Sequence, residues 1–237
     1  MQGRVHSFQS LGTVDGPGVR AVVFMQGCPL RCVCCHNPDT WALDGGSLTT
    51  PEAMAEKIRR LKAYFGKEGG VTVSGGEPLV QAEFVTELFR ILKSEGISCA
   101  LDTSGCVYNS HVEELLSLCD IVLLDYKYTN DEDYKSKCGC SISKVDLFLE
   151  KLEELGKRVW IRQVVIPGLN DSEQSLEKLY ALKERFGCVE KIELLPFRKL
   201  CLEKYAAMGI EFPLCDTPEA DPAVVAEIGR KMEDKNK

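Results

Sequence analysis

The sequence lacks any hydrophobic run long enough to cross a membrane. Its longest apolar runs, including residues 21–25 and 121–124, have the length of a β-strand, whereas a membrane-spanning helix needs about 20 apolar residues. Residues 1–7 also lack the basic start and the apolar segment of a secretory signal. We therefore expect a soluble cytoplasmic protein with no membrane partner.

An excess of basic residues is also missing. The 29 Lys and Arg residues are outnumbered by 36 Asp and Glu residues, which gives a formal net charge of -7. Proteins that bind nucleic acid usually carry a basic face, so we expect no nucleic-acid partner. The sequence has no repeat or low-complexity tract, and its 237 residues suit one domain, which we expect to span residues 1–237.

Cysteine, in contrast, is abundant, with twelve residues in the chain. Without a secretory signal, this number predicts reduced thiols in a reducing compartment rather than a disulfide framework. Cys138 and Cys140 suggest a second metal or redox site, but C-x-C spacing alone is weak evidence. Packing as small apolar side chains is the simpler interpretation for most cysteines outside the segment described next.

Four cysteines are concentrated in one short segment, the cysteine loop, residues 28–36. Cys28, Cys32 and Cys35 have the spacing C-x3-C-x2-C. A [4Fe-4S] cluster normally takes four thiolates, so three cysteines leave one iron open to a further ligand. A zinc site is the alternative, but no second C-x2-C pair follows. Cys34 could replace Cys35 in a looser count, and we place Cys34 outside the cluster.

Apolar β-branched runs alternate with amphipathic segments along the chain. This pattern predicts helices at about residues 50–65, 81–95, 111–118, 144–155, 171–186 and 222–232, and strands at residues 19–25, 71–73, 98–101, 121–124, 159–165 and 191–195. Six strand–helix units predict a parallel α/β sheet. The pattern alone leaves open a partial barrel and a doubly wound sheet. In a barrel, the polar motifs after the strands would meet at one mouth.

Those polar motifs resemble a known family. Besides the cysteine loop they are Thr-Val-Asp-Gly-Pro-Gly at 13–18, Ser-Gly-Gly-Glu-Pro at 74–78, Leu-Asp-Thr-Ser-Gly at 101–105, Leu-Asp-Tyr-Lys at 124–127, Trp-Ile-Arg at 160–162 and Glu-Leu-Leu-Pro at 193–196. In this order the chain resembles the radical S-adenosylmethionine (radical SAM) family, and within it the activating enzymes of glycyl radical enzymes. The resemblance implies a partial (β/α)6 TIM-like barrel, with a C-terminal helical extension after about residue 200.

The resemblance also implies a set of site residues. Beside the cluster cysteines, Asp15 and Arg162 would serve catalysis, Asp15 by contacting the substrate's glycine loop. The residues implied for S-adenosylmethionine are Cys34, Cys35, His36, Gly75, Gly76, Glu77, Asp102, Thr103, Asp125, Tyr126, Lys127 and Arg198. Charged groups at the ends of apolar strands are costly unless paired or bound, which favours a functional role. For Asp102 the alternative is a helix cap, and for residues 74–77 it is a plain turn.

This sequence departs from the pattern of the family at two positions. The residue before the third cluster cysteine is usually aromatic in the family, and here it is Cys34. The activating enzymes have a histidine where this chain has Arg198. A guanidinium plane can also stack on a purine.

The activity that the resemblance implies is that of a radical SAM oxidoreductase. One electron from a single reduced [4Fe-4S] cluster would cleave S-adenosylmethionine to methionine and a 5′-deoxyadenosyl radical. The radical would take a hydrogen atom from a glycine of a glycyl radical enzyme of the pyruvate formate-lyase type. Flavodoxin or ferredoxin would supply the electron to a monomeric enzyme, and a monovalent cation near Asp102 is a further candidate cofactor. The alternatives are a radical enzyme for a small molecule and a non-catalytic iron–sulfur electron carrier.

Replacing each cysteine of the loop separately tests the ligand assignment. We expect Cys28→Ser, Cys32→Ser and Cys35→Ser each to lose the cluster, because iron–sulfur clusters are held by thiolates. Cys34→Ser should keep it. Iron and sulfide analysis of anaerobically prepared protein measures the outcome. Retention of the cluster in Cys35→Ser, with loss in Cys34→Ser, would make Cys34 the third ligand.

Overall fold

A computed structural model describes residues 1–235 of the chain. Within these residues the strands form one eight-stranded sheet in the order β3-β1-β2-β4-β5-β6-β7-β8. The strands are β1 (Gly3–Gly12), β2 (Arg20–Met25), β3 (Ser47–Thr49), β4 (Gly70–Gly75), β5 (Ser98–Thr103), β6 (Ile121–Asp125), β7 (Arg158–Val165) and β8 (Val189–Pro196). The pairs from β2 to β8 are parallel, and β1 pairs antiparallel with β2 and β3.

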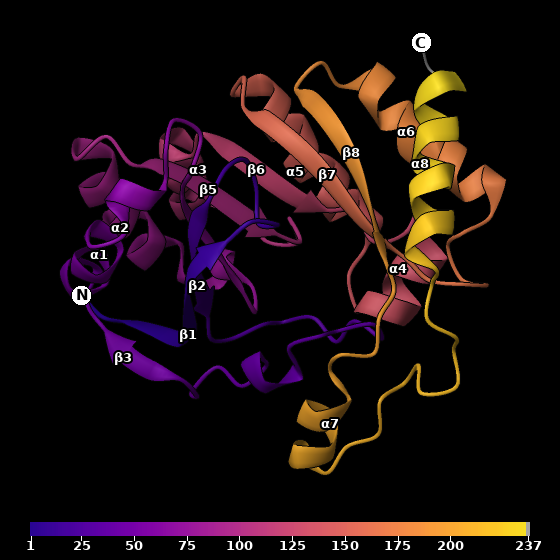
Figure 1. Cartoon of the computed structure of the whole chain (residues 1–237), viewed down its shortest axis with the longest axis horizontal. Coiled ribbons are helices and arrows are strands. Elements are labelled where there is room, and N and C mark those ends of the chain that lie inside the picture. The colour runs from indigo at the N-terminus through magenta and orange to yellow at the C-terminus, as the bar shows by residue number, and fades with distance from the viewer. Residues whose placement is uncertain (236–237) are drawn as a thin grey trace.

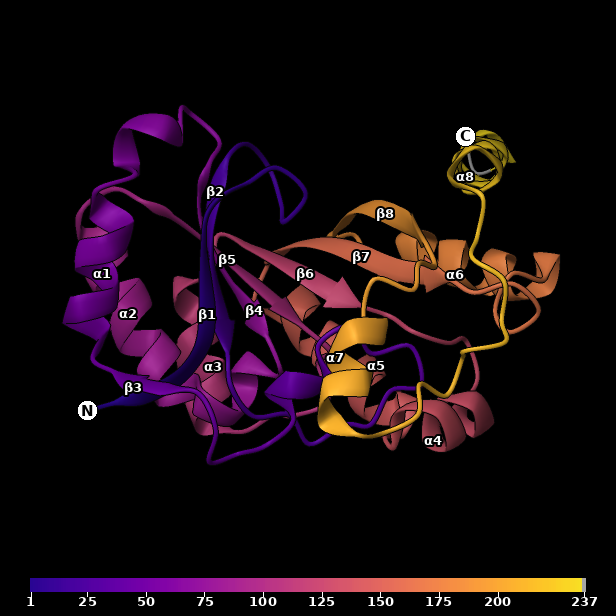
Figure 2. The ribbon, with the colours of Figure 1, turned by 60° about the horizontal axis from the view of Figure 1, so that its bottom comes forward.

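The helices pack along the curved sheet rather than on both of its faces. They are α1 (Pro51–Arg59), α2 (Ala82–Ser94), α3 (Ser110–Leu118), α4 (Asp131–Cys138), α5 (Ile142–Glu154), α6 (Glu173–Arg185), α7 (Leu202–Met208) and α8 (Pro222–Lys235). Figures 1 and 2 show α1, α2, α3 and α5 on the outer side of the sheet, and α8 lies beside β8. The short helix α7 lies apart from β7 and β8 and contacts the 3-10 turn at Pro38–Thr40. None of the helices within residues 1–235 is long and apolar enough to span a membrane.

The parallel strands confirm the sequence prediction of an α/β partial barrel. All six expected strands are present, and their ends differ from the predicted ones by at most two residues. In the described part of the chain β3 and β8 are the edges of the sheet, so the barrel is not closed. The predicted helix 50–65 is shorter, because α1 ends at Arg59 and a 3-10 turn follows at Lys62–Tyr64.

Three elements were not predicted, namely β1, β3 and α4, whereas α7 and α8 lie in the helical extension expected after about residue 200. The helix α4 has a polar sequence with only Tyr134 and Cys138 buried, so it carries little apolar periodicity. Its ends nevertheless have standard signals. The Asn130 side chain accepts a hydrogen bond from the amide of Asp133 at 2.9 Å, and Gly139 ends the helix in the left-handed conformation, with φ 78°.

The two faces of the sheet differ in chemistry. The outer face carries buried apolar residues such as Val73, Val122 and Ile161, which belong to the main core with the helices. The inner face has a small apolar cluster around Ile121 and Leu123, and its remaining positions are largely polar. A polar inner face in an unclosed barrel is suited to ligand binding.

One buried arginine holds the amino ends of three strands together. Arg20, at the start of β2, is fully buried. Its guanidinium donates to the Thr72 hydroxyl at 2.8 Å, to the carbonyl of Val71 at 2.7 Å and to the carbonyls of Pro17 and Ser98 at 3.1 Å. Burial lowers its pKa to about 10, which leaves it charged near neutral pH. Arg20 therefore fixes the loop before β2 relative to β4 and β5.

Removal of this guanidinium should destabilise the protein strongly. We expect Arg20→Met to lower the free energy of unfolding by roughly 3 kcal/mol or more, because several buried carbonyl groups lose their donor. Urea unfolding followed by circular dichroism measures the loss. Arg59→Met, which removes an exposed guanidinium paired with Glu95, is the matched control and should have a small effect. Equal losses in the two variants would contradict the role of Arg20.

Candidate active site

Polar residues from neighbouring strands meet at the carboxyl ends of the parallel sheet. Asp125 of β6 is level with Arg162 of β7, and Arg162 is level with Glu193 of β8. On the other side of the barrel Met25 of β2 is level with Gly75 of β4. The parallel register therefore brings motifs that are far apart in the sequence to one region.

The cysteine loop follows β2 and is fastened to the end of α4. The backbone amides of Arg31 and Val33 donate to the carbonyl oxygens of Cys138 and Lys137, at 3.1 and 2.9 Å. Inside the loop, the amide of Cys35 donates to the carbonyl of Cys32 at 3.0 Å. The turn after α4 thus supports the shape of the loop.

The four thiols of the loop fall into two groups. Cys32 belongs to the main apolar core, and Cys28 and Cys35 pack against it. Cys34 belongs to a second cluster that includes Phe197. The charges of Cys28, Cys32 and Cys35 act on one another, but Cys32 and Cys35 act on Cys34 as well. The packing places Cys34 in a different apolar cluster from the other three thiols, and the choice of the three ligands stays a prediction.

The loop thiols differ in how firmly they hold their protons. Burial raises the pKa of Cys28 to about 12 and also raises the pKa of Cys35. A hydrogen bond with Cys138 lowers the pKa of Cys32 to about 7. Because cysteine binds iron as the thiolate, metal binding must release the protons of Cys28 and Cys35. Three thiols in one half-buried loop have the chemistry that an iron–sulfur cluster requires.

Among residues 1–235, no three His, Cys, Asp or Glu side chains are placed around the position of one metal ion.

Glu77, a predicted cofactor residue, has its carboxylate fully engaged. It accepts hydrogen bonds from the backbone amides of Leu79 and Ser104 at 3.1 and 2.9 Å. It also accepts from the Thr103 hydroxyl at 2.6 Å and from the Ser104 hydroxyl. Burial raises its pKa, and these hydrogen bonds oppose that shift. Glu77 and Thr103 thereby join the loop after β4 to the loop after β5.

The two glycines before Glu77 allow the strands to approach closely. Gly75 has φ 111°, and a Cβ atom at Gly76 would lie 2.4 Å from the carbonyl oxygen of Gly27. The amides of Gly76 and Glu77 donate to the carbonyls of Met25 and Gly27, both at 2.9 Å. These amides are therefore engaged as donors. An ammonium group only donates hydrogen bonds, so it would need oxygen acceptors such as backbone carbonyl groups here.

Arg162 lies on the inner face of β7 among carboxylates. Its Nη1 is 3.5 Å from Asp102 Oδ1, and its Nε is 3.8 Å from Glu193 Oε2. Both distances exceed those of good hydrogen bonds. Within the described residues, Arg162 Nε and Nη1 and Asp102 Oδ1 are buried without a hydrogen-bond partner. Buried donors and acceptors usually have a hydrogen-bond partner, so these atoms are available to an ordered water or to a bound polar group.

The electrostatic field around Arg162 is strongly negative. Burial alone would lower the pKa of Arg162, but Asp102, Asp125, Glu193 and Asp15 together raise it. The guanidinium is therefore permanently charged. It can pair with a carboxylate or a peptide carbonyl of a ligand.

Asp102 is held by β4 and is not a helix cap. Its Oδ2 accepts from the Ser74 hydroxyl at 2.6 Å, whereas α3 is capped by Asn109. The helix-cap alternative is therefore wrong. Burial raises the pKa of Asp102 to about 6, and the charge of Arg162 opposes the shift.

The side chains of residues 125–127 lie on different sides of the sheet. Lys127 Nζ donates to Asp125 Oδ2 at 2.9 Å. Burial disfavours the charge on Asp125, but Lys127 and Arg162 outweigh it and lower its pKa. Tyr126 instead belongs to the outer core, and its hydroxyl donates to Asp146 at 2.7 Å. The structure thus does not place the Tyr126 ring beside Asp125 and Lys127.

The remaining predicted residues lie around the edge of this region. Asp15 is half-buried before β2, where burial raises its pKa against the attraction of Arg162. His36 Nε2 donates to the carbonyl of Arg198 at 2.6 Å, which joins the cysteine loop to the segment after β8. The Arg198 side chain pairs with Glu219 at 3.4 Å.

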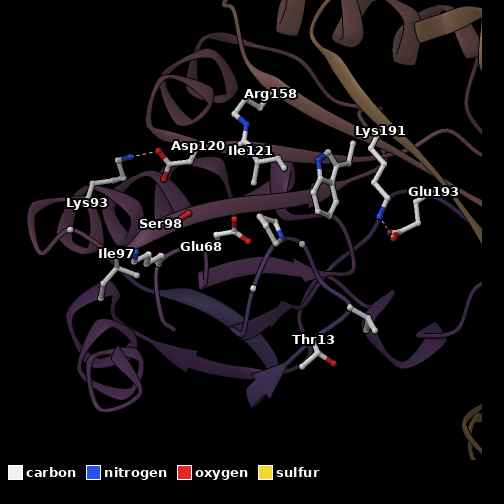
Figure 3. Close-up of a pocket in the computed structure, with 17 residues that line it drawn as sticks. Thr13, Glu68, Lys93, Ile97, Ser98, Asp120, Ile121, Arg158, Lys191 and Glu193 are labelled. Atoms are coloured by element: carbon white, nitrogen blue, oxygen red, sulfur yellow. Dashed lines mark hydrogen bonds and ion pairs between the residues drawn. The ribbon is translucent and has the colours of Figure 1, made fainter. Parts of the chain in front are cut away.

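A separate cavity opens at the amino ends of the strands. It has a volume of about 810 Å³ and lies where the unclosed barrel brings the loop 13–18 near β7 and β8. Figure 3 shows Lys191 and Glu193 on one side of the cavity and Thr13 on another. Glu193 also approaches Arg162, so the cavity leads toward the polar centre of the barrel. The sequence predicted only the mouth at the carboxyl ends.

Two contributors to this site, Glu193 and Cys138, have no role in the site predicted from the sequence. Glu193 is a charged residue among the apolar positions of its strand, and this pattern could have identified it. Position 138, considered only as part of a C-x-C pair, contributes both its carbonyl and its thiol to the cysteine loop.

Comparisons with known proteins show which family the chain resembles. The model of the Radical SAM superfamily matches residues 22–179. A pyruvate formate-lyase-activating enzyme of Clostridium pasteurianum is 45% identical over 222 residues, which cover 93% of each chain. Pyruvate formate-lyase 1-activating enzyme of Escherichia coli (strain K12) is 42% identical over 240 residues, covering 97% of this chain and 98% of the relative.

A solved structure shows the same fold. It is a domain of pyruvate-formate lyase-activating enzyme from Bacteroides vulgatus, with a TM-score of 0.56 and 22% sequence identity. The match covers 69% of this chain and 92% of that domain. At this identity the likeness supports the arrangement of strands and helices.

The raised pKa of Asp102 predicts a pH dependence of stability. A carboxyl group whose pKa is about 6 when folded and about 4 when unfolded stabilises the fold when protonated. This stabilisation is complete below pH 4 and disappears as the pH rises through 6, a change of roughly 2 to 3 kcal/mol. Asp102→Asn removes the titrating group, so its stability relative to wild type should rise across this range. Urea unfolding of the metal-free protein at several pH values measures the difference, and a constant difference would contradict the assignment.

Proposed function

This chain belongs to the radical SAM superfamily, and on that basis we propose that it activates a glycyl radical enzyme of the pyruvate formate-lyase type. The observation that carries the proposal is the 42–45% identity to curated activating enzymes over at least 93% of both chains. The site adds chemical support, because the cysteine loop and the polar inner face of the barrel lie in the same part of the fold.

The cofactors of this family are an iron–sulfur cluster and S-adenosylmethionine. We assign the cluster as a single [4Fe-4S] group on Cys28, Cys32 and Cys35. When bound, these cofactors supply the reductive cleavage of S-adenosylmethionine to methionine and a 5′-deoxyadenosyl radical, which takes a hydrogen atom from a backbone glycine. The task of the protein is to position the reactants and to exclude water and other hydrogen donors.

The charged residues of the barrel would orient the cofactor and the substrate. Asp102, Asp125 and Lys127 lie at the carboxyl ends of the strands, on the side of the cysteine loop. Arg162 lies near them on the inner face of β7. Its Nε and Nη1 atoms have no hydrogen-bond partner within residues 1–235. We assign Arg162 as a donor to a carboxylate or peptide carbonyl, and Asp102 as a contact for the polar end of S-adenosylmethionine or for a monovalent cation.

The glycine loop of the partner would enter through the cavity at the amino ends of the strands (Figure 3). Its volume of about 810 Å³ accommodates a short peptide segment. The cavity is bordered by Val14, an apolar residue whose side chain is 71% exposed, and by the half-buried Trp160. An exposed apolar residue beside a cavity is a common mark of a protein contact. Asp15 lies in the same loop and is our candidate for contact with the glycine backbone.

The compartment, the electron source and the oligomeric state complete the proposal. The twelve cysteines are free thiols in the structure, which suits a reducing cytoplasm. We assign flavodoxin or ferredoxin as the electron donor and a single-domain monomer as the working form.

An anaerobic assay with the reconstituted protein tests the proposal. Incubation with S-adenosylmethionine and a one-electron reductant should release 5′-deoxyadenosine, and addition of pyruvate formate-lyase should produce a glycyl radical signal in electron paramagnetic resonance. An electron carrier would release no 5′-deoxyadenosine. Release of 5′-deoxyadenosine without a glycyl radical on the partner would instead favour a small-molecule substrate.

Two surface variants separate entry of the partner from cofactor cleavage. Val14→Asp adds a charge at the cavity and should slow glycyl radical formation about tenfold or more, the loss expected when an interface contact worth about 1.4 kcal/mol is removed. Cleavage of S-adenosylmethionine without the partner should stay unchanged. Val224→Asp on α8, also at an exposed apolar position, is the matched control. Equal rates in both variants would exclude this entry route.

A further inference from the structure

The inner face of the sheet has an apolar layer next to the charged residues around Arg162. Trp160 of β7 is level with Leu123 of β6 and with Lys191 of β8. It packs against the small inner cluster that contains Ile121 and Leu123. Arg162 lies two residues further along β7, and alternation along a strand places both side chains on the same face. The Trp160 ring is therefore the next side chain from Arg162 toward the amino ends of the strands.

The Trp160 ring is held in place by residues of β8. Its Nε1 donates to Glu190 Oε2 at 3.3 Å, and Lys191 Nζ lies 4.6 Å from the centroid of the ring. Lys191 is itself paired with Glu193 Oε1 at 2.8 Å. A hydrogen bond and a cation–π contact thus fix the plane of the ring. A fixed aromatic side chain loses little conformational entropy when a ligand packs on it.

Part of this ring borders the cavity at the amino ends of the strands. The cavity of about 810 Å³ is lined by Trp160 and Ile121, and by Val14 from the loop before β2. Trp160 is only half-buried, so its ring has surface to offer a ligand. Figure 3 shows Ile121 on the same side of the cavity as Lys191, away from Thr13. The wall formed by β6 and β7 is therefore apolar where it approaches Arg162.

A charged side chain is a poor occupant for this wall. Charged residues at the cavity already form ion pairs, namely Lys93 with Asp120, Arg158 with Glu190 and Lys191 with Glu193. An apolar side chain gains free energy by leaving water and packing on an aromatic ring. The surface beside Trp160 thus favours a large apolar side chain.

We propose that Trp160 forms an apolar subsite for a large side chain of the partner's glycine loop and so makes activation selective for the sequence beside the glycine. The inference rests on the proposed function, under which Arg162 binds a peptide carbonyl or carboxylate and the glycine loop enters through this cavity. Side chains on one face of an extended chain are about 7 Å apart, every second residue. The side chain on Trp160 should therefore lie within two residues of the glycine.

Competition between short synthetic peptides tests the subsite. One peptide has a single glycine among serines, and four others each have one leucine, placed one or two residues before or after the glycine. With the wild-type holoenzyme, at least one leucine peptide should inhibit glycyl radical formation on pyruvate formate-lyase at about tenfold lower concentration than the serine peptide. Partial burial of a leucine side chain supplies a gain of this size. Electron paramagnetic resonance measures the radical.

Two substitutions distinguish a specificity role of Trp160 from a structural one. Trp160→Ala should reduce the preference for leucine to about twofold or less. Trp160→Phe keeps an aromatic plane and should retain most of the preference. A purely structural role would weaken all the peptides alike in Trp160→Ala and leave their ratio unchanged. The ratio is measured within one protein, so a lower yield of active variant does not alter it.

The outcomes separate this inference from the proposed function. A wild-type protein that forms no glycyl radical on the partner would overturn both. A normal radical signal with no leucine peptide preferred over the serine peptide would overturn the inference alone, and this comparison needs no variant. An undiminished preference in Trp160→Ala would also overturn it. A preference present in the wild type and in Trp160→Phe, and lost in Trp160→Ala, would support it.

Discussion

The interior of this barrel is organised around the guanidinium group of Arg162, whose Nε and Nη1 atoms have no hydrogen-bond partner among the described residues. Arg162 lies close to Asp102 and Glu193, but at 3.5 and 3.8 Å these groups attract without bonding well. Keeping such a charge in a buried place is costly unless a ligand completes its shell. The polar inner face is therefore suited to binding a ligand. The stability of the fold comes mainly from the apolar outer face of the sheet and the helices that cover it.

The supports of the site are themselves connected to that outer core. Glu77 joins the loops after β4 and β5 through four hydrogen bonds, and the end of α4 holds the cysteine loop through two backbone hydrogen bonds. Arg20 does the same at the opposite end of the barrel, where it fixes the loop before β2. The loops of the site are thus connected by hydrogen bonds to strands or helices of the fold.

Much of this arrangement could be predicted from the sequence, because strand ends and thiol spacing are local patterns. The outward side chain of Tyr126 was missed, although alternation along β6 gives it: Leu123 and Asp125 point inward, so Tyr126 points outward. The full engagement of Glu77 could not be predicted, since its partners come from another loop. The polar helix α4 and the cavity beside residues 13–18 also depend on tertiary contacts that have no local pattern.

The unclosed barrel provides two separate routes to the same centre. The cysteine loop and the Asp125–Lys127 pair occupy the carboxyl ends of the strands, while the cavity at the amino ends leads past Glu193 to Arg162. A closed barrel of this size would be filled by layers of side chains. β8 is not paired with β2 within the described chain, so the barrel is open on one side. Under the proposed function, the cofactor and the protein segment would approach Arg162 from opposite ends and would not compete for one opening.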